Sequence, residues 1–249
     1  MSEYINLDFE NIEKEHICCA IGDPKHQDGV NRKKEWIKEK LKDGHVFRKL
    51  NDRGKIFIKY EPIETAWVPI RGKNYYYIYC LWVAGSFKGK GHAKNLLEYC
   101  IKDAKKRKKS GICTVVSKKK KPFINEKKFF THFGFKVIDN IKDYELMALQ
   151  FDDKETPKFN ENARKMEIED KDFTIFYSNE CPYVEYEVKE LSDYAKENNI
   201  KLNFMKIDSL EKAKKAPCVF NNWANFYKGE FISNIILNAN ALKKLIGGK

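Results

Sequence analysis

Apolar and polar residues follow one another along the first 150 residues with periods that predict a mixed sheet covered by helices. Residues 75–83 (YYYIYCLWV) form an apolar run that is typical of a central strand buried on both faces. In residues 94–106 apolar side chains recur every three or four positions, which indicates an amphipathic helix. The turn at residues 51–54 (NDRG) separates two strand-like runs and predicts a hairpin. The predicted order is β-α-β-β-β-α-β-α-β-β, in residues 17–21, 22–44, 46–50, 55–63, 75–83, 94–106, 111–116, 125–133, 135–139 and 145–151.

A second α/β pattern begins after a polar stretch. Residues 153–171 are rich in charge, contain Pro157 and lack apolar periodicity, so we interpret them as a linker. Beyond them the predicted order is β-α-β-α-β-β-α, with strands in residues 173–178, 200–207 and 218–220, a helix in 184–198, a hairpin around Lys228-Gly229 and a last helix in 239–246. The fold class is therefore α/β (α+β), with predicted boundaries of 1–152 for the first domain, 153–171 for the linker and 172–249 for the second domain.

Composition excludes several classes of protein. Hydrophobic residues make up 42% of the 249 residues, which is enough for a core and argues against a disordered chain. The longest near-apolar stretch, residues 75–85, is about half of what a membrane-spanning helix needs, so we expect no membrane partner. The acidic start shows no secretory pattern, and seven cysteines, an odd number, do not indicate a disulfide framework. We therefore expect a cytoplasmic protein with reduced thiols.

The positive charge is confined to one half of the chain. Residues 1–150 contain 32 Lys and Arg against 19 Asp and Glu, whereas residues 151–249 contain 16 against 17. A Lys-rich coding bias would account for an excess of lysine over the whole chain. It does not account for the location of the excess in the first half, which a polyanionic ligand of that half would explain. Only six of the 48 basic residues are Arg, so sequence-specific nucleic-acid binding is disfavoured. Histidines are scattered and no metal-binding pattern is present, so we expect no metal site.

The segment after the central strand carries the clearest chemistry. Residues 81–93 (LWVAGSFKGKGHA) join that strand to the amphipathic helix through a glycine-rich turn. Gly89 and Gly91 let the backbone approach a ligand closely, and the first N–H groups of the following helix point to the same place. The helix dipole and the side chains of Lys88 and Lys90 add positive charge. An isolated turn of this kind is often a plain strand–helix corner, but here strand, glycine spacing and helix all favour a pyrophosphate site.

These residues resemble a known signature. Lys88-Gly89-Lys90-Gly91-His92-Ala93 is similar to the R/Q-x-x-G-x-G/A motif of GNAT-type N-acyltransferases, with Lys88 in place of Arg or Gln. The resemblance implies a GNAT-type mixed sheet in which the central strand diverges from its parallel neighbour. It also implies that acetyl-CoA is the co-substrate, that its pantetheine arm pairs with the backbone of Leu81, Trp82 and Val83, and that its pyrophosphate binds the amides of Lys88, Gly89, Lys90, Gly91, His92 and Ala93.

The family mechanism implies direct attack of an acceptor amine on the thioester, with a base to take the proton. Glu61 and Glu64 are candidates for the base, although exposed strand carboxylates without a role are the more common case. Cys80 lies near the expected divergence of the strands, where packing is the usual role of a cysteine. The sequence departs from the family at two positions: Phe130 stands where a Tyr often acts as the acid, and Phe123 stands where an Asn is frequent.

The second domain contains a different motif. Cys181-Pro182-Tyr183-Val184 resembles the C-P-Y-C site of glutaredoxins without its second cysteine, and the segment around Pro217 resembles the cis-proline segment of thioredoxin-like domains. A helix N-terminus there would favour the thiolate of Cys181. The whole chain resembles GNAT-type acyltransferases that end in a YoaP-like domain. We expect an N-acetyltransferase with a small-molecule or peptide amine acceptor; the alternative is a thiol-redox or thiol-carrier protein centred on Cys181, and the sequence leaves the acceptor and the oligomeric state open.

Overall fold

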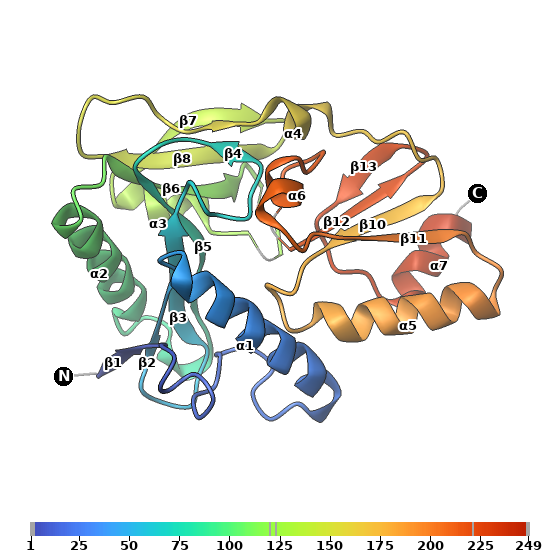
Figure 1. Cartoon of the computed structure of the whole chain (residues 1–249), viewed down its shortest axis with the longest axis horizontal. Coiled ribbons are helices and arrows are strands. Elements are labelled where there is room, and N and C mark those ends of the chain that lie inside the picture. Colours follow the sequence, from blue (N-terminus) through green and yellow to red (C-terminus); the bar gives the residue numbers. More distant parts are fainter. Residues whose placement is uncertain (1–2, 120, 123, 221, 248–249) are drawn as a thin grey trace.

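The computed structural model describes residues 3–119, 121–122, 124–220 and 222–247 and divides into two lobes (Figure 1). A seven-stranded sheet forms the first lobe, in the order β1-β2-β3-β5-β6-β8-β7. The sheet is mixed because β5 and β6 are parallel while its other neighbours are antiparallel. Its strands are β1 (Tyr4–Asn6), β2 (Val46–Leu50), β3 (Ile56–Pro62), β5 (Tyr75–Val83), β6 (Gly111–Ser117), β7 (Lys136–Ile141) and β8 (Tyr144–Gln150). The predicted mixed sheet is therefore confirmed.

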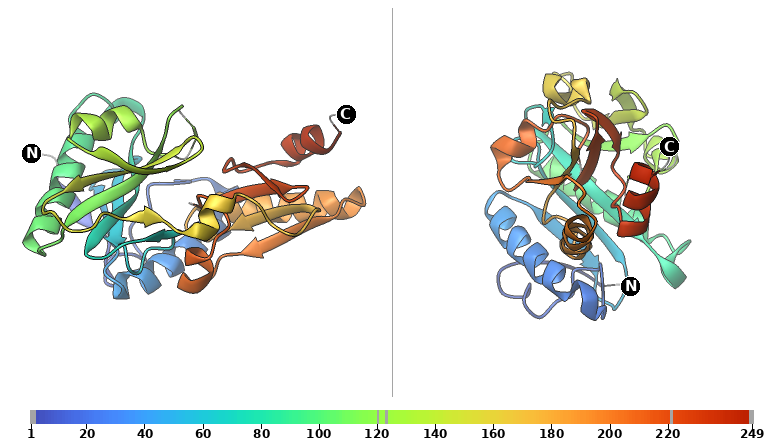
Figure 2. Two further views of the ribbon diagram at one scale, coloured as in Figure 1. Left: turned by 90° about the horizontal axis from the view of Figure 1, so that it is seen from above. Right: turned by 90° about the vertical axis from the view of Figure 1, so that its right-hand side faces the viewer.

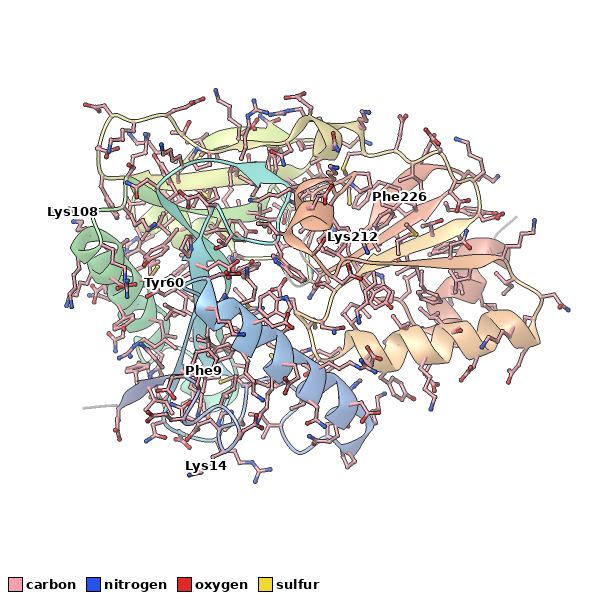
Figure 3. The ribbon with its side chains drawn as sticks, in the orientation of Figure 1. Phe9, Lys14, Tyr60, Lys108, Lys212 and Phe226 are labelled. Carbon is pink, nitrogen blue, oxygen red and sulfur yellow. The ribbon has the colours of Figure 1, made fainter. Side chains whose placement is uncertain are left out.

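Helices cover both faces of this sheet. On one face α2 (His92–Lys106) buries Leu96 and Leu97 in a core that also contains Tyr60 of β3. On the other face α1 (Gln27–Lys42) buries Trp36 and Ile37 against the aromatic side chains of β5. Figure 3 shows Tyr60 inside this lobe and Lys108, just beyond α2, at the surface. The shorter helices of the lobe are η1 (Pro24–His26), η2 (Gly85–Phe87) and α3 (Lys127–His132).

A four-stranded sheet in the order β11-β10-β12-β13 forms the second lobe. The strands β10 and β11 are parallel, and β12 is antiparallel to both of its neighbours. The elements are β10 (Phe173–Tyr177), α5 (Val184–Glu197), β11 (Leu202–Lys206), α6 (Leu210–Lys214), β12 (Trp223–Tyr227), β13 (Glu230–Ser233) and α7 (Ala239–Gly247). Most predicted elements are present, but residues 218–220 form a buried loop instead of a strand. The peptide bond before Pro217 is trans, so the expected cis-proline is wrong, and the thioredoxin-like relationship stays a prediction.

The segment that we interpreted as a linker is folded. Within residues 153–171, β9 (Lys158–Phe159) pairs with β4 (Ile70–Arg71) of the first lobe, and α4 (Glu161–Lys165) follows. Phe159 is fully buried. The polar composition of this segment did not indicate that it pairs with β4 or that Phe159 is buried.

The two lobes share one hydrophobic core. Val219 and Phe220 of the second lobe belong to the same cluster of buried side chains as Tyr77 and Tyr79 of β5. Figure 2 shows the lobes joined end to end, with α1 running toward α5 in Figure 1. Gly29 of α1 is required for this approach, because a Cβ atom there would lie 1.9 Å from the carbonyl oxygen of Pro182. Polar contacts add to the interface: Arg32 pairs with Glu185 at 2.9 Å, and Lys214 donates to the carbonyl oxygens of Ile63 and Ile70.

The N-terminal segment differs from the sequence-based prediction. The first strand is Tyr4–Asn6, and residues 17–21, which we expected as a strand, form a buried loop in which Cys18 and Ala20 have positive φ angles. Apolar character here reflects burial of a loop between α1 and β3, which periodicity does not distinguish from a short strand. In the part of the chain that the structure describes, every helix is too short or too polar to cross a membrane.

Candidate active site

A bulge in β5 opens the sheet at its centre. Lys59 of β3 lies opposite Cys80, and the next residue of β3, Tyr60, lies opposite Ile78, so Tyr79 is an extra residue in β5. The pairing of β5 with β6 ends at Ile78. Beyond that point β5 continues to Val83 against β3 alone, and its other edge diverges from β6. The bulge also reverses the alternation of side chains, so that Cys80 and Trp82 face the side of the sheet that α1 covers.

Asn125 lies in the divergence between the two strands. Its side-chain oxygen accepts a hydrogen bond from the N–H of Leu81 at 3.1 Å, and its amide nitrogen donates to the hydroxyl of Thr114 at 2.8 Å. The N–H of Ala84 donates to the carbonyl oxygen of Lys55, the residue before β3, so alternation directs the N–H of Val83 to the open edge. Asn125 was missed by the sequence reasoning; Phe123, the position at which the family comparison expected Asn, lies outside the described residues.

The glycine-rich turn presents unpaired N–H groups to solvent. Gly89 and Gly91 have φ angles of +76° and +79°, and a Cβ atom built at either residue would have no heavy atom within 4 Å. Gly91 is the residue before α2. Among the described residues, the N–H groups from Gly89 to Lys94 donate no hydrogen bond. The turn therefore has the open surface and the free donors that a pyrophosphate requires.

Side chains around the turn fix its shape. The ring of His92 is buried and its Nδ1 lies 2.7 Å from the hydroxyl of Tyr4, so its side chain anchors the start of α2 to β1. Lys88 and Lys90 are exposed beside the glycines and are available to a negatively charged group. Residues 88–93 thus lie between β5 and α2 and include the first residues of α2.

A cavity of about 450 Å³ lies between the lobes, next to the end of β5. Both lobes contribute to it, and Asn125 connects it with the divergence of β5 and β6. This size is typical of small-molecule sites. The lining residues are Cys19, Lys33, Lys55, Phe57, Lys59, Cys80, Trp82, Pro122, Ile124, Asn125, Glu180, Cys181, Pro182, Tyr183 and Asn222.

An ion pair between the lobes lies in the wall of this cavity. Nζ of Lys59 on β3 is 2.5 Å from a carboxylate oxygen of Glu180, and both side chains are almost fully buried. Burial alone would lower the pKa of Lys59, but the carboxylate of Glu180 raises it above its ordinary value. Neither residue was predicted from the sequence. The one available signal was that Lys59 lies within a mainly apolar strand, where a buried lysine is unusual.

Glu61, one predicted base, is completely buried away from the cavity. Its carboxylate accepts a hydrogen bond from Tyr79 at 2.6 Å and contacts Nδ1 of His45 at 2.8 Å and Nζ of Lys40 at 3.3 Å. Tyr79 is in turn held by the backbone N–H of Trp67. This network holds Tyr79, the extra residue of the bulge. Glu61 therefore has a structural role, and its position is not that of a base.

The other predicted catalytic residues are dispersed. Glu64 is exposed and accepts a hydrogen bond from the N–H of Asn74, before the first residue of β5. At about 3.3 Å per residue, Leu81 lies roughly 20 Å farther along the strand, so Glu64 does not reach the acyl end of the site. Cys80 does line the cavity, but burial raises the pKa of its thiol to about 12. Phe130 is buried beside Phe135 in the core.

Cys181 is placed in the cavity without the activation that the sequence suggested. The helix α5 begins three residues later, and burial raises the pKa of the Cys181 thiol to about 11. At neutral pH the group is therefore a thiol, which is a poor nucleophile. The position of a second motif cysteine is taken by Val184, which is buried.

Comparisons with known proteins agree with this geometry. The family model described as "Acetyltransferase (GNAT) family" matches residues 12–135. Over 245 residues, 98% of each chain, the sequence is 37% identical to the "Uncharacterized N-acetyltransferase YoaP" of Bacillus subtilis (strain 168). The chain belongs to the GNAT acetyltransferase family. It is thus an N-acetyltransferase whose acyl donor is acetyl-CoA, and the alternative of a thiol-redox protein is not favoured.

The second lobe of this GNAT acetyltransferase also has a family match, because a model described as "YoaP-like" covers residues 201–244. Among solved structures, a GNAT family acetyltransferase from Staphylococcus aureus Mu50 aligns with 61% of this chain and 100% of its own, at 17% identity and a TM-score of 0.43. A GNAT family acetyltransferase from Brucella melitensis in complex with acetyl-CoA aligns with 64% of this chain and 94% of its own, at 11% identity and a TM-score of 0.42. In the described ranges, no group of three or more His, Cys, Asp or Glu side chains is arranged to hold a metal ion.

Proposed function

We propose that this acetyltransferase binds acetyl-CoA along the open edge of β5 and transfers the acetyl group directly to an amine held in the cavity between the lobes. The observation that carries the proposal is the continuity of three features: free N–H groups at residues 89–94, an edge of β5 at Leu81–Val83 that pairs with no other strand, and a cavity that meets this edge at Asn125, which holds the N–H of Leu81. The N–H groups and Lys88 and Lys90 would hold the pyrophosphate. The unpaired edge of β5 would pair with the pantetheine arm.

Residues of both lobes would form the acceptor site. The cavity receives Lys59, Cys80 and Trp82 from the central sheet and Glu180 and Tyr183 from the second lobe. Among the described residues that line it, Glu180 alone carries a carboxylate, so it is our candidate for the general base in place of Glu61 and Glu64. This assignment gives the second domain a part in catalysis that the sequence motif around Cys181 does not.

The proposed reaction has one chemical step on the acyl carbon. The acceptor nitrogen forms a bond to the acetyl carbonyl carbon, and the bond from that carbon to the sulfur of CoA breaks. Glu180 takes the proton that the nitrogen loses, with Lys59 holding the carboxylate in position. The thiolate of CoA then takes a proton from solvent, because no acid is placed at the position of Phe130.

A calorimetric titration with acetyl-CoA tests the donor site. In Gly91→Ala the new methyl group would project into the open space above the turn, where the pyrophosphate is expected, so we predict at least a tenfold weaker affinity. Gly134→Ala is the matched control, because Gly134 has a similar φ of +83° and the same backbone penalty of about 1–2 kcal/mol. The control should lose stability like Gly91→Ala and keep its affinity. Equal affinity in both variants, or wild-type protein that binds NAD as well as acetyl-CoA, would contradict the proposal.

A further inference from the structure

The cavity between the lobes contains a buried lysine that forms no ion pair with any described residue. Lys33 of α1 is 1% exposed, and its side chain lines the cavity. Its Nζ has one polar contact among the described residues, the sulfur of Cys19 at 4.0 Å, and lies 5.5 Å and 5.7 Å from the ring centres of Phe47 and Phe57. A buried ammonium group is costly without an anion, and packing against two aromatic rings offsets only part of that cost. The position of Lys33 therefore indicates an anionic ligand group.

Two side chains that accept hydrogen bonds line the same cavity. The carboxylate of Glu180 has a buried partner in Lys59. Asn222 is 6% exposed, and its side-chain oxygen has no hydrogen-bond partner within the described part of the chain. Both side chains accept hydrogen bonds, as a primary amine or ammonium group requires. The cavity thus contains a buried ammonium group, that of Lys33, and two buried hydrogen-bond acceptors, Glu180 and Asn222.

The rest of the wall is mainly apolar. Phe57, Trp82, Ile124, Pro182 and Tyr183 are among the residues that line it. A volume of about 450 Å³ accommodates a molecule larger than a simple alkylamine. The ligand that suits this lining has an apolar body, an amino group and an acidic group.

We propose that the acceptor is a free amino acid with an apolar side chain, whose carboxylate binds Lys33 and whose amino group faces Glu180 and Asn222. The inference rests on the proposed function and adds the class of the acceptor. The products are the N-acetylated amino acid and CoA, and the proton leaves through Glu180. A lysine side chain of a protein is the competing acceptor, and it carries no carboxylate for Lys33 to bind.

Matched pairs of acceptors test the inference without any mutation. Leucine, methionine, phenylalanine and tryptophan are each compared with the corresponding amino-acid amide, which keeps the amine and replaces the carboxylate by a neutral group. Release of free CoA from acetyl-CoA is followed by chromatography. We expect kcat/KM for at least one acid to exceed that of its amide tenfold or more. In Lys33→Met this preference should disappear, and in Lys33→Arg part of it should remain. Lys42→Met, an exposed lysine of the same helix, is the control that should keep it.

Each outcome separates the inference from the function on which it rests. Equal or faster turnover of the amides overturns the inference and leaves acetyl transfer intact. Binding of acetyl-CoA without turnover of either series, or turnover of a lysine peptide alone, also overturns it. Failure to bind acetyl-CoA overturns the proposed function itself. If Lys33→Met does not fold, Lys33→Arg and the wild-type comparison of acid with amide still decide the question.

Discussion

Glu180→Gln tests whether the second lobe supplies both a structural and a catalytic group. The substitution removes the charge opposite Lys59 and leaves a buried ammonium group that is about 5% exposed. Breaking a buried pair by removing one partner costs roughly 3–5 kcal/mol. For a chain of this size 1 kcal/mol corresponds to about 2–4 °C, so Tm should fall by roughly 6–20 °C. The double variant Lys59→Met/Glu180→Gln removes the orphaned charge and should recover most of this loss.

Activity and stability should separate in the double variant. If Glu180 is the base, kcat stays about 10²–10⁴-fold below wild type even where Tm has recovered. The assay combines thermal unfolding with release of CoA, and the control is Arg32→Met, which breaks an exposed pair between the lobes, Arg32 with Glu185. A Glu180→Gln variant with wild-type kcat and a Tm within about 2 °C of wild type would refute the reasoning.

The same pair has a signature at high pH. Because the pKa of Lys59 is raised in the folded protein above its ordinary value of 10.5, the pair stabilises the fold below that pH. This contribution is lost as pH rises through the folded-state pKa. Wild type should therefore lose stability above about pH 10.5 more steeply than the double variant does. Parallel stability profiles of the two proteins would contradict the ion pair as described.

Three further predictions concern other parts of the molecule. Cys181→Ser should keep acetyl transfer within about twofold, since burial holds this residue as a thiol; loss of activity in the CoA-release assay would restore the thiol mechanism. Burial lowers the pKa of His45 below 6.5, so the free energy of unfolding should fall as pH drops below 6.5, by up to about 1.4 kcal/mol per pH unit. Urea unfolding at several pH values should show a weaker dependence of this free energy on pH in His45→Gln. Gly29→Ala should destabilise the fold by about 1–3 kcal/mol in the same unfolding assay, because its Cβ would meet Pro182; an unchanged midpoint would contradict this packing.

Periodicity predicted most of the secondary structure, because the strands and helices of the first lobe have regular apolar patterns. Residues 75–83 were predicted as a central strand and form β5 with those bounds. The exceptions have a physical cause. Residues 17–21 and 218–220 are apolar because they are buried loops, and residues 153–171 are polar although a few side chains anchor them. In the two apolar segments local composition reports burial and not backbone pairing, and in residues 153–171 it reports neither.

The proposed acetyl-CoA site could be predicted from the sequence because its residues are close together along the chain. A strand, a glycine turn and a helix follow one another within 13 residues, from Leu81 to Ala93. The acceptor side is not local: Lys33 and Lys59 come from distant segments of the first lobe, and Glu180 comes from the second lobe. A weak signal existed, because Lys33 lies in the apolar stripe of its helix with Val30 and Ile37. Which groups surround such a lysine is set by the tertiary structure.

Amide hydrogen exchange with and without acetyl-CoA tests the central claim most directly, because it reports on the N–H groups that are proposed to bind the ligand. In the described structure the N–H groups of residues 89–94 have no acceptor and should exchange rapidly in the free protein. Acetyl-CoA should slow exchange in peptides that cover residues 81–94, while peptides from the β7–β8 hairpin, residues 136–150, should not change. Unaltered exchange in residues 81–94 at a saturating concentration of acetyl-CoA would contradict the account.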